Sequence, residues 1–155
     1  PGGAYAPSPT ADWHLLVGDE SALPAVAAAL ERLPVGAPAK VFLEVEGPAD
    51  ELPLASPGPV ELTWLHRAGR PVGEALVEAV RALDFPPGVV HAFVHGEATF
   101  VKELRRLLRV ERGVPREALS ISGYWRRGMT DEGWRSTKAD WNAQVEADEA
   151  GALSA

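Results

Sequence analysis

Residues 13–24 read WHLLVGDESALP, and this stretch decides the fold. Trp13 to Val17 form a short apolar run that stops at Gly18, which is the pattern of a buried strand. The apolar residues that follow recur at helical spacing, at Leu23, Val26, Ala27, Leu30 and Leu33. A buried strand that turns directly into an amphipathic helix begins a β-α-β unit, so the stretch predicts a parallel sheet.

The same alternation continues along the chain. Further apolar strands are expected at 41–45, 60–65, 89–94 and 119–122, and helices at 21–33, 73–83 and 97–110. The Pro- and Gly-rich segment 47–59 separates two strands without a clear helix, and its length favours a crossover over a hairpin. We therefore expect an α/β fold, a three-layer parallel sheet of about five strands, followed by a C-terminal helix.

Composition limits the function classes. The chain has 155 residues, of which 46% are hydrophobic and 24% charged, as in one globular domain. Fifteen Lys and Arg against 22 Asp and Glu give a net charge of -7, which argues against nucleic acid as a partner. The absence of Cys excludes disulfides, thiolate metal sites and a Cys nucleophile. The sequence contains neither a secretory signal pattern nor an apolar run of the roughly 20 residues that span a bilayer, so we expect a cytoplasmic protein.

Three regions are expected along the chain. Residues 1–12 read as a linker, which we interpret as following an upstream domain that this chain lacks. Residues 13–128 form the α/β domain, and residues 129–155 form a helical tail. Trp134, Trp141 and Val145 share one face of a helix expected at 131–148. We expect that face to dock on this domain, with the free end toward the carboxyl edge of the sheet.

The turn after the first strand is the first candidate site, because parallel sheets bind ligands beyond the carboxyl ends of their strands. Gly18 permits a sharp turn, Ser21 can cap the helix, and the first helical N–H groups suit a pyrophosphate. Asp19 and Glu20 would repel a phosphate unless they point away. An ordinary capped turn explains the same residues.

Two residues bear on which dinucleotide, NAD or NADP, such a site would bind, and they disagree. Arg67 follows the third strand, beside His66, and could pair with the 2'-phosphate of NADP. Glu46 ends the second strand, where an acid holds the ribose 2'-OH of NAD in dinucleotide folds. The first clue predicts a preference for NADPH and the second a preference for NADH. Mainly because of Arg67, we expect a preference for NADPH.

The fourth strand repeats the strand–Gly–helix arrangement at Gly96, Glu97 and Ala98, where Glu97 favours the helix start through the helix dipole. The basic residues of the following helix are expected to form a solvated face; they are Lys102, Arg105, Arg106, Arg109 and Arg112. The four His residues show no metal-ligand spacing, so no metal site is expected.

Several motifs, in this order, resemble the carboxyl-terminal half of siderophore-interacting proteins. They are G-D-E-S-A-L-P-A at 18–25, W-L-H-R at 64–67, G-E-A at 96–98, L-R-R at 104–106 and S-G-Y-W-R-R-G at 122–128. The similarity runs from about Gly2 to Trp141. Members of that family are flavin-dependent ferric-siderophore reductases related to ferredoxin-NADP reductase, whose carboxyl-terminal domain has a nucleotide-binding parallel sheet.

The resemblance implies a site residue by residue. Gly18, Asp19, Glu20, Ser21 and Ala22 would cradle the pyrophosphate of NADPH (or NADH), and His66 and Arg67 would take its adenosine-phosphate side. Gly96, Glu97 and Ala98 would lie near the nicotinamide, and Tyr124 and Trp125 near the flavin edge. Arg126 and Arg127 would attract the anionic ferric siderophore.

The resemblance also implies a division of labour. The R-x-Y-[ST] flavin motif expected of the family's β-barrel is absent here, so FAD would be bound by an upstream domain in cis. This chain would then be the NAD(P)H-binding half, without catalytic residues of its own. The alternative from another class is a non-catalytic nucleotide-binding or interaction domain that has the same fold.

Overall fold

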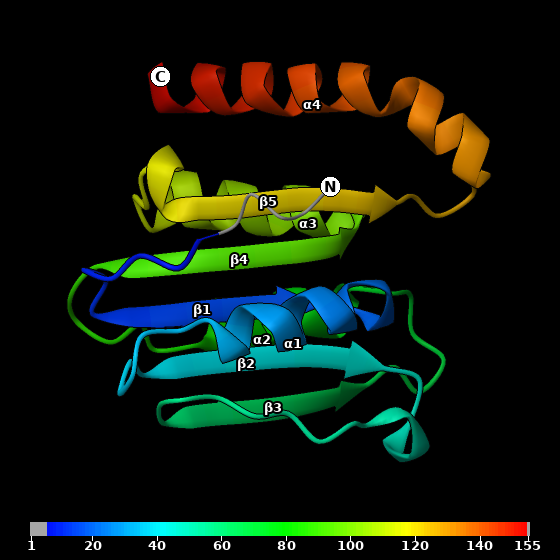
Figure 1. The fold of residues 1–155 in the computed structure, drawn as a ribbon. Helices are drawn as coiled ribbons and strands as arrows, with labels where there is room; N and C mark the ends of the chain where they lie inside the picture. Colours follow the sequence, from blue (N-terminus) through cyan, green and yellow to red (C-terminus); the bar gives the residue numbers. More distant parts are fainter. Residues whose placement is uncertain (1–5, 155) are drawn as a thin grey trace.

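Five parallel strands form one sheet in the order β3-β2-β1-β4-β5 (Figure 1). The computed structural model describes residues 6–154, so the first five linker residues and Ala155 lie outside the described residues. Every neighbouring pair of strands is parallel. The strands are β1 (Trp13–Gly18), β2 (Ala39–Val45), β3 (Val60–His66), β4 (Val90–Glu97) and β5 (Leu119–Trp125).

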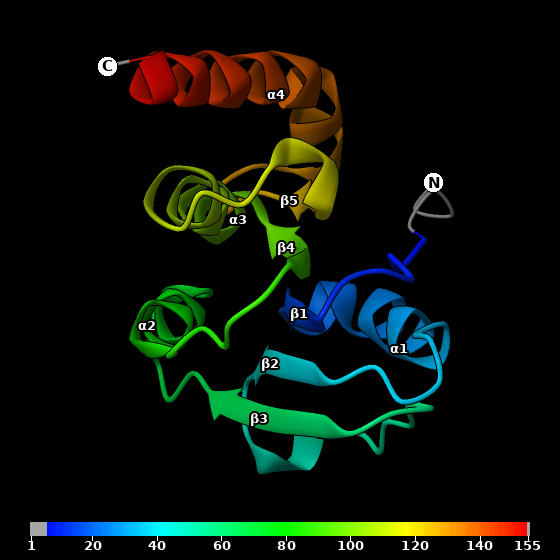
Figure 2. The same cartoon turned by 90° about the vertical axis from the view of Figure 1, so that its left-hand side faces the viewer.

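Helices cover both faces of the sheet. α1 (Leu23–Glu31) lies on one face, and α2 (Glu74–Ala82) and α3 (Ala98–Arg106) lie on the other (Figure 2). Strand β1 contributes side chains to both cores, as its apolar run predicts. Leu15 packs into the core that contains Leu76 and Phe100, and Leu16 packs into the core that contains Leu30 of α1. The predicted three-layer α/β fold is confirmed.

The connection between β2 and β3 is a crossover, as its length predicts. Val41 pairs with Leu62 in parallel register, so the chain returns to the amino edge before β3 begins. The only helical turn within this connection is a short 3-10 turn, Pro48–Asp50. The Pro-rich segment therefore connects two parallel strands without a crossover helix.

The tail forms α4 (Asp131–Ser154), which is longer than the expected 131–148. It docks on this domain: Trp134 is 3% exposed and Val145 5%. Trp141 is partly buried and meets Trp134 edge-to-face, with ring centroids 5.4 Å apart. The expected direction of the free end is wrong, because α4 starts beyond the carboxyl end of β5 and runs back toward the amino edge (Figure 1).

The solvated face expected for the basic residues of 97–112 is wrong in part: Lys102, Arg106 and Arg112 are exposed, but α4 covers Arg105 of α3 and Arg109 in the π-helical turn Leu107–Glu111 that follows it. Glu149 of α4 accepts hydrogen bonds from Arg105, at 3.2 Å, and from Arg109, at 2.7 Å. Arg112 instead lies over the Phe85 ring, 4.2 Å from its centroid. Arg105, Arg109 and Arg112 therefore each contact another part of the chain.

Among residues 6–154, no helix has the length and apolar content needed to cross a bilayer.

Candidate functional site

The strand order changes direction between β1 and β4, so the carboxyl ends of these two strands form the crevice where such sheets bind ligands. Gly18 stands beside His95 in the register of β1 and β4. A side chain at Gly96 would lie 2.8 Å from Asp19, and Gly96 has a φ of 143°. Glycine is therefore required at Gly96, where the two turns contact each other.

Asp19 connects the ends of three strands, and it is only 2% exposed. Its Oδ1 accepts the Ser21 N–H at 3.0 Å. Its Oδ2 accepts the Glu97 N–H at 2.9 Å and the Trp125 Nε1–H at 3.1 Å. Asp19, and not Ser21 as expected, caps the 3-10 turn Glu20–Ala22 that precedes α1.

Glu97 belongs to β4 and not to the following helix, since a bulge at Gly96 and Glu97 extends the strand. It still starts α3 as expected, because its Oε2 accepts the N–H and the hydroxyl of Thr99, each at 3.0 Å. The Arg127 N–H reaches the same oxygen at 3.3 Å. The side chain is fully buried, and Oε1 has no hydrogen-bond partner among the described residues; the Nε atom of Arg127 is 3.7 Å away.

Arg67 is buried, not solvated, and carboxylates surround it. Its terminal nitrogens lie 2.6 Å from Glu20, 3.2 Å from Glu46 and 3.4 Å from Glu44. Glu44 is fully buried and also accepts the Gly73 N–H. Burial raises the pKa of the Glu44 carboxyl, against the opposing effects of Gly73 and Arg67. We call these four side chains, Arg67 with Glu20, Glu44 and Glu46, the Arg67 cluster.

His66, which precedes Arg67, pairs instead with Glu51, whose Oε2 is 2.6 Å from its Nε2.

His95 holds Tyr124 at the end of β5. One ring nitrogen lies 2.9 Å from the Tyr124 hydroxyl and the other 2.9 Å from the Ser120 hydroxyl. The ring also stacks on Phe93, with centroids 3.7 Å apart. Burial lowers the pKa of His95 to about 4, so the ring is neutral at neutral pH. Burial and the nearby Asp19 raise the pKa of Tyr124, so it stays a phenol.

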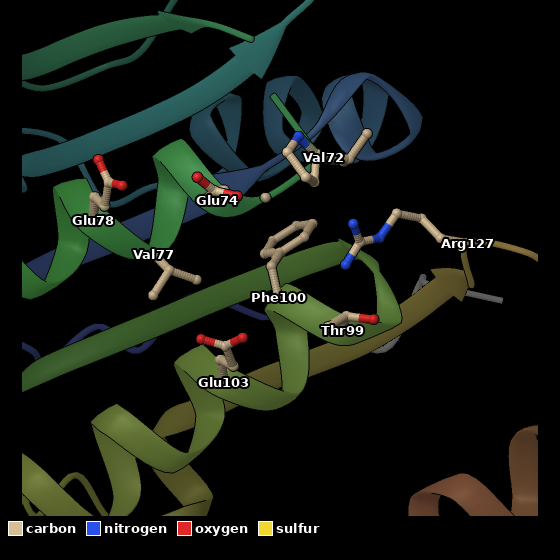
Figure 3. Close-up of a pocket in the computed structure, with 10 residues that line it drawn as sticks. Val72, Glu74, Val77, Glu78, Thr99, Phe100, Glu103 and Arg127 are labelled. Atoms are coloured by element: carbon tan, nitrogen blue, oxygen red, sulfur yellow. The ribbon is translucent and has the colours of Figure 1, made fainter. Parts of the chain in front are cut away.

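A pocket of about 240 Å³ opens between the first turns of α2 and α3 (Figure 3). Val72 and the Phe100 ring supply apolar surface, and Arg127 reaches in from the segment after β5. Three carboxylates also line the pocket: Glu74, Glu78 and Glu103. Gly73 lies against Phe100 with a φ of 91°, and a side chain there would come within 2.3 Å of it. Close packing of these two helix starts thus forms one wall of the pocket.

Within residues 6–154, no three His, Asp or Glu side chains gather in a way that could hold a metal ion.

The family model described as siderophore-interacting protein matches residues 11–128, which is most of the chain. The chain belongs to this family. The match confirms the resemblance that the motifs indicate.

Two curated proteins are similar in sequence to this siderophore-interacting protein. It is 53% identical to an uncharacterized protein of Mycobacterium tuberculosis, over 95% of this chain and 56% of the relative. It is 35% identical to the ferric vibriobactin reductase ViuB of Vibrio cholerae, over 89% of this chain and 52% of ViuB. The chain therefore spans about half the length of these relatives.

Solved structures show the same fold. A siderophore utilization protein from T. fusca is 42% identical, with a TM-score of 0.72 over 80% of this chain and 48% of that one. The siderophore-interacting protein SipS from Aeromonas hydrophila is 29% identical, with a TM-score of 0.74 over 84% and 52%.

The structure brings most of the expected site residues of this siderophore-interacting protein to one edge. The Gly18–Ala22 turn, Gly96 to Ala98 and the strand residues Tyr124 and Trp125 meet around Asp19. Arg126 and Arg127 are both exposed, and Arg127 also lies beside Glu97.

Sequence reasoning missed two residues of this edge. Glu44 carries a detectable signal, because it is a lone acid inside an apolar strand. His95 carries only a weak one, the alternation with Phe93 in β4.

Proposed function

We propose that this chain is the NAD(P)H-binding half of a flavin-dependent ferric-siderophore reductase. One observation carries the proposal: the carboxyl ends of β1, β4 and β5 meet around Asp19, where the strand order changes direction. The chain also belongs to the siderophore-interacting protein family. The relation to a ferric vibriobactin reductase supports the reaction class.

The dinucleotide would lie along the carboxyl edge. The pyrophosphate would pass the 18–22 turn, close to the backbone at Gly18. Since the Ser21 and Ala22 N–H groups already bond to Asp19, the turn would attract the phosphates through the positive end of α1 more than through free donors.

The nicotinamide would lie near Gly96, Glu97 and Ala98. Asp19 fixes the Trp125 ring and His95 fixes the Tyr124 hydroxyl, so both aromatic side chains are held in place before any ligand arrives. FAD, bound by an upstream domain, would supply the redox chemistry, taking a hydride and passing single electrons to Fe(III) in the siderophore. Iron would leave as Fe(II).

The ferric siderophore would approach from the side of the exposed Arg126 and Arg127. Guanidinium groups suit anionic chelators, because they are always charged and offer several donors. A cytoplasmic location completes the proposal, since iron release there would make it available to the cell.

The test uses the protein with its upstream sequence included. We expect flavin absorbance, bleaching of that absorbance by NADH or NADPH, and Fe(II) trapped by a chelator when a ferric siderophore is added. The 155-residue chain alone should be colourless and inactive. A longer protein without flavin that still binds the dinucleotide would instead support a non-catalytic nucleotide-binding domain. Bound FAD or ferric reduction with the 155-residue chain alone would contradict the division of labour.

A further inference from the structure

We infer that the Arg67 cluster makes this protein select NADH over NADPH, with Glu46 and Glu20 as the selecting residues and Arg67 as their anchor. The inference rests on the proposed function, because it concerns the ribose end of the same nucleotide.

Arg67 lacks the free guanidinium that a 2'-phosphate partner needs. Its Nη2 atom lies between Glu20 and Glu46, and its Nη1 atom faces Glu44. The residue is only 8% exposed. A phosphate would have to displace carboxylates that already hold the same donors, in charge-assisted bonds of the same kind. The support for an NADPH preference is lost with that free cation.

The charge of the cluster points the same way. Three carboxylates face one guanidinium, so the cluster is net negative even when the buried Glu44 is protonated. A 2'-phosphate placed there would meet like charge at close range, which disfavours it. The ribose of NADH, which has hydroxyls in place of that phosphate, meets no such repulsion.

Glu46 is placed to recognise those hydroxyls. It directly follows β2, at the position where an acid binds the ribose 2'-OH in dinucleotide folds, and its side chain is 77% exposed. Arg67 bonds to its Oε2, and its backbone N–H donates to Glu20 at 3.3 Å. Among residues 6–154 no hydrogen bond involves its Oε1, so that oxygen can accept from the diol.

The experiment is a calorimetric titration of the 155-residue chain with NAD+ and with NADP+ at low ionic strength. We expect NAD+ to bind at least tenfold more tightly, and the difference to narrow as salt screens the repulsion. Glu46→Gln should tighten NADP+ at least threefold and leave NAD+ equal or weaker. The double variant with Glu20→Gln should narrow the gap further. Glu46→Gln changes an exposed side chain, so the fold should tolerate it.

Glu31→Gln is the matched control, because it removes one exposed acid at the other end of α1 and should change neither affinity. Wild-type NADP+ binding as tight as NAD+ binding would overturn the inference and leave the proposed function intact. Equal effects of Glu46→Gln on both ligands would also overturn it. Binding of neither dinucleotide would overturn the proposed function together with the inference.

Discussion

Two ion clusters in this molecule have opposite compositions. In the Arg67 cluster, one guanidinium at the carboxyl edge meets three carboxylates. Between α3 and α4, one carboxylate, Glu149, meets the two guanidinium groups of Arg105 and Arg109. The central residues are almost equally buried, with Arg67 8% and Glu149 7% exposed.

We call Glu149 with Arg105 and Arg109 the Glu149 cluster; the two clusters differ in which charge is in excess. Burial raises the pKa of Glu149, but hydrogen bonds and charge from Arg105 and Arg109 outweigh burial and lower it overall. Around Arg67 the negative charges are in excess, and burial raises the pKa of Glu44. The first arrangement favours ionisation and joins two helices. The second keeps uncompensated charge at the edge where a ligand would bind.

The largest expected effect concerns the structural side. Ending the chain after Thr130 removes α4, with the buried Trp134 and Val145. Each buried apolar side chain contributes roughly 1.5 to 3 kcal/mol, so the melting temperature should fall by about 10 °C or more. Ending the chain after Gly151 keeps all these contacts and is the matched control. Equal melting temperatures for the Thr130 truncation and the full chain would contradict the docking of α4.

Glu149→Gln tests the cluster of Glu149 with Arg105 and Arg109. It leaves Arg105 and Arg109 without a carboxylate, and we expect a loss of about 2 kcal/mol at neutral pH. Because the folded-state pKa of Glu149 is lowered, this advantage of the wild type is present above its ordinary value of 4.5 and fades as the pH falls below it. Melting curves from pH 3 to 7 would measure it, with Glu146→Gln, an exposed acid, as the control. A stability difference between the wild type and Glu149→Gln that does not change with pH would contradict this account of the Glu149 ion pairs.

For Glu44→Gln, the stability difference from the wild type should change with pH in the opposite direction, and its size should be smaller, about 1 kcal/mol. The folded-state pKa of Glu44 is raised, so its contribution to stability is greatest below 4.5 and is lost as the pH rises through the raised value. The wild type should therefore lose stability relative to the variant as the pH increases. Melting curves over the same pH range would measure this difference. If the stability difference between the wild type and Glu44→Gln instead grew with pH, as expected for Glu149→Gln, the described contrast between the two clusters would be wrong.

Much of the fold follows from local pattern. The spacing of Trp134 and Val145 identifies the docked face of α4, and the apolar runs locate every strand, although β4 and β5 extend to Glu97 and Trp125. Periodicity reports only on neighbours in sequence, and the decisive pairs of the site are not neighbours. Arg67 meets Glu44 from 23 residues away, and Arg105 meets Glu149 from 44. Sequence alone therefore could not show that Arg67 is surrounded by carboxylates or that Glu149 covers Arg105 and Arg109.

The most direct test of the central claim is a titration of the isotope-labelled 155-residue chain with NADH, followed through its backbone amide resonances. Weak binding remains visible in such a measurement. The account predicts saturable shifts concentrated at residues 18–22, 96–98 and 124–127, along the carboxyl edge of the sheet. Shifts confined to the amino edge, or none at millimolar NADH, would contradict it.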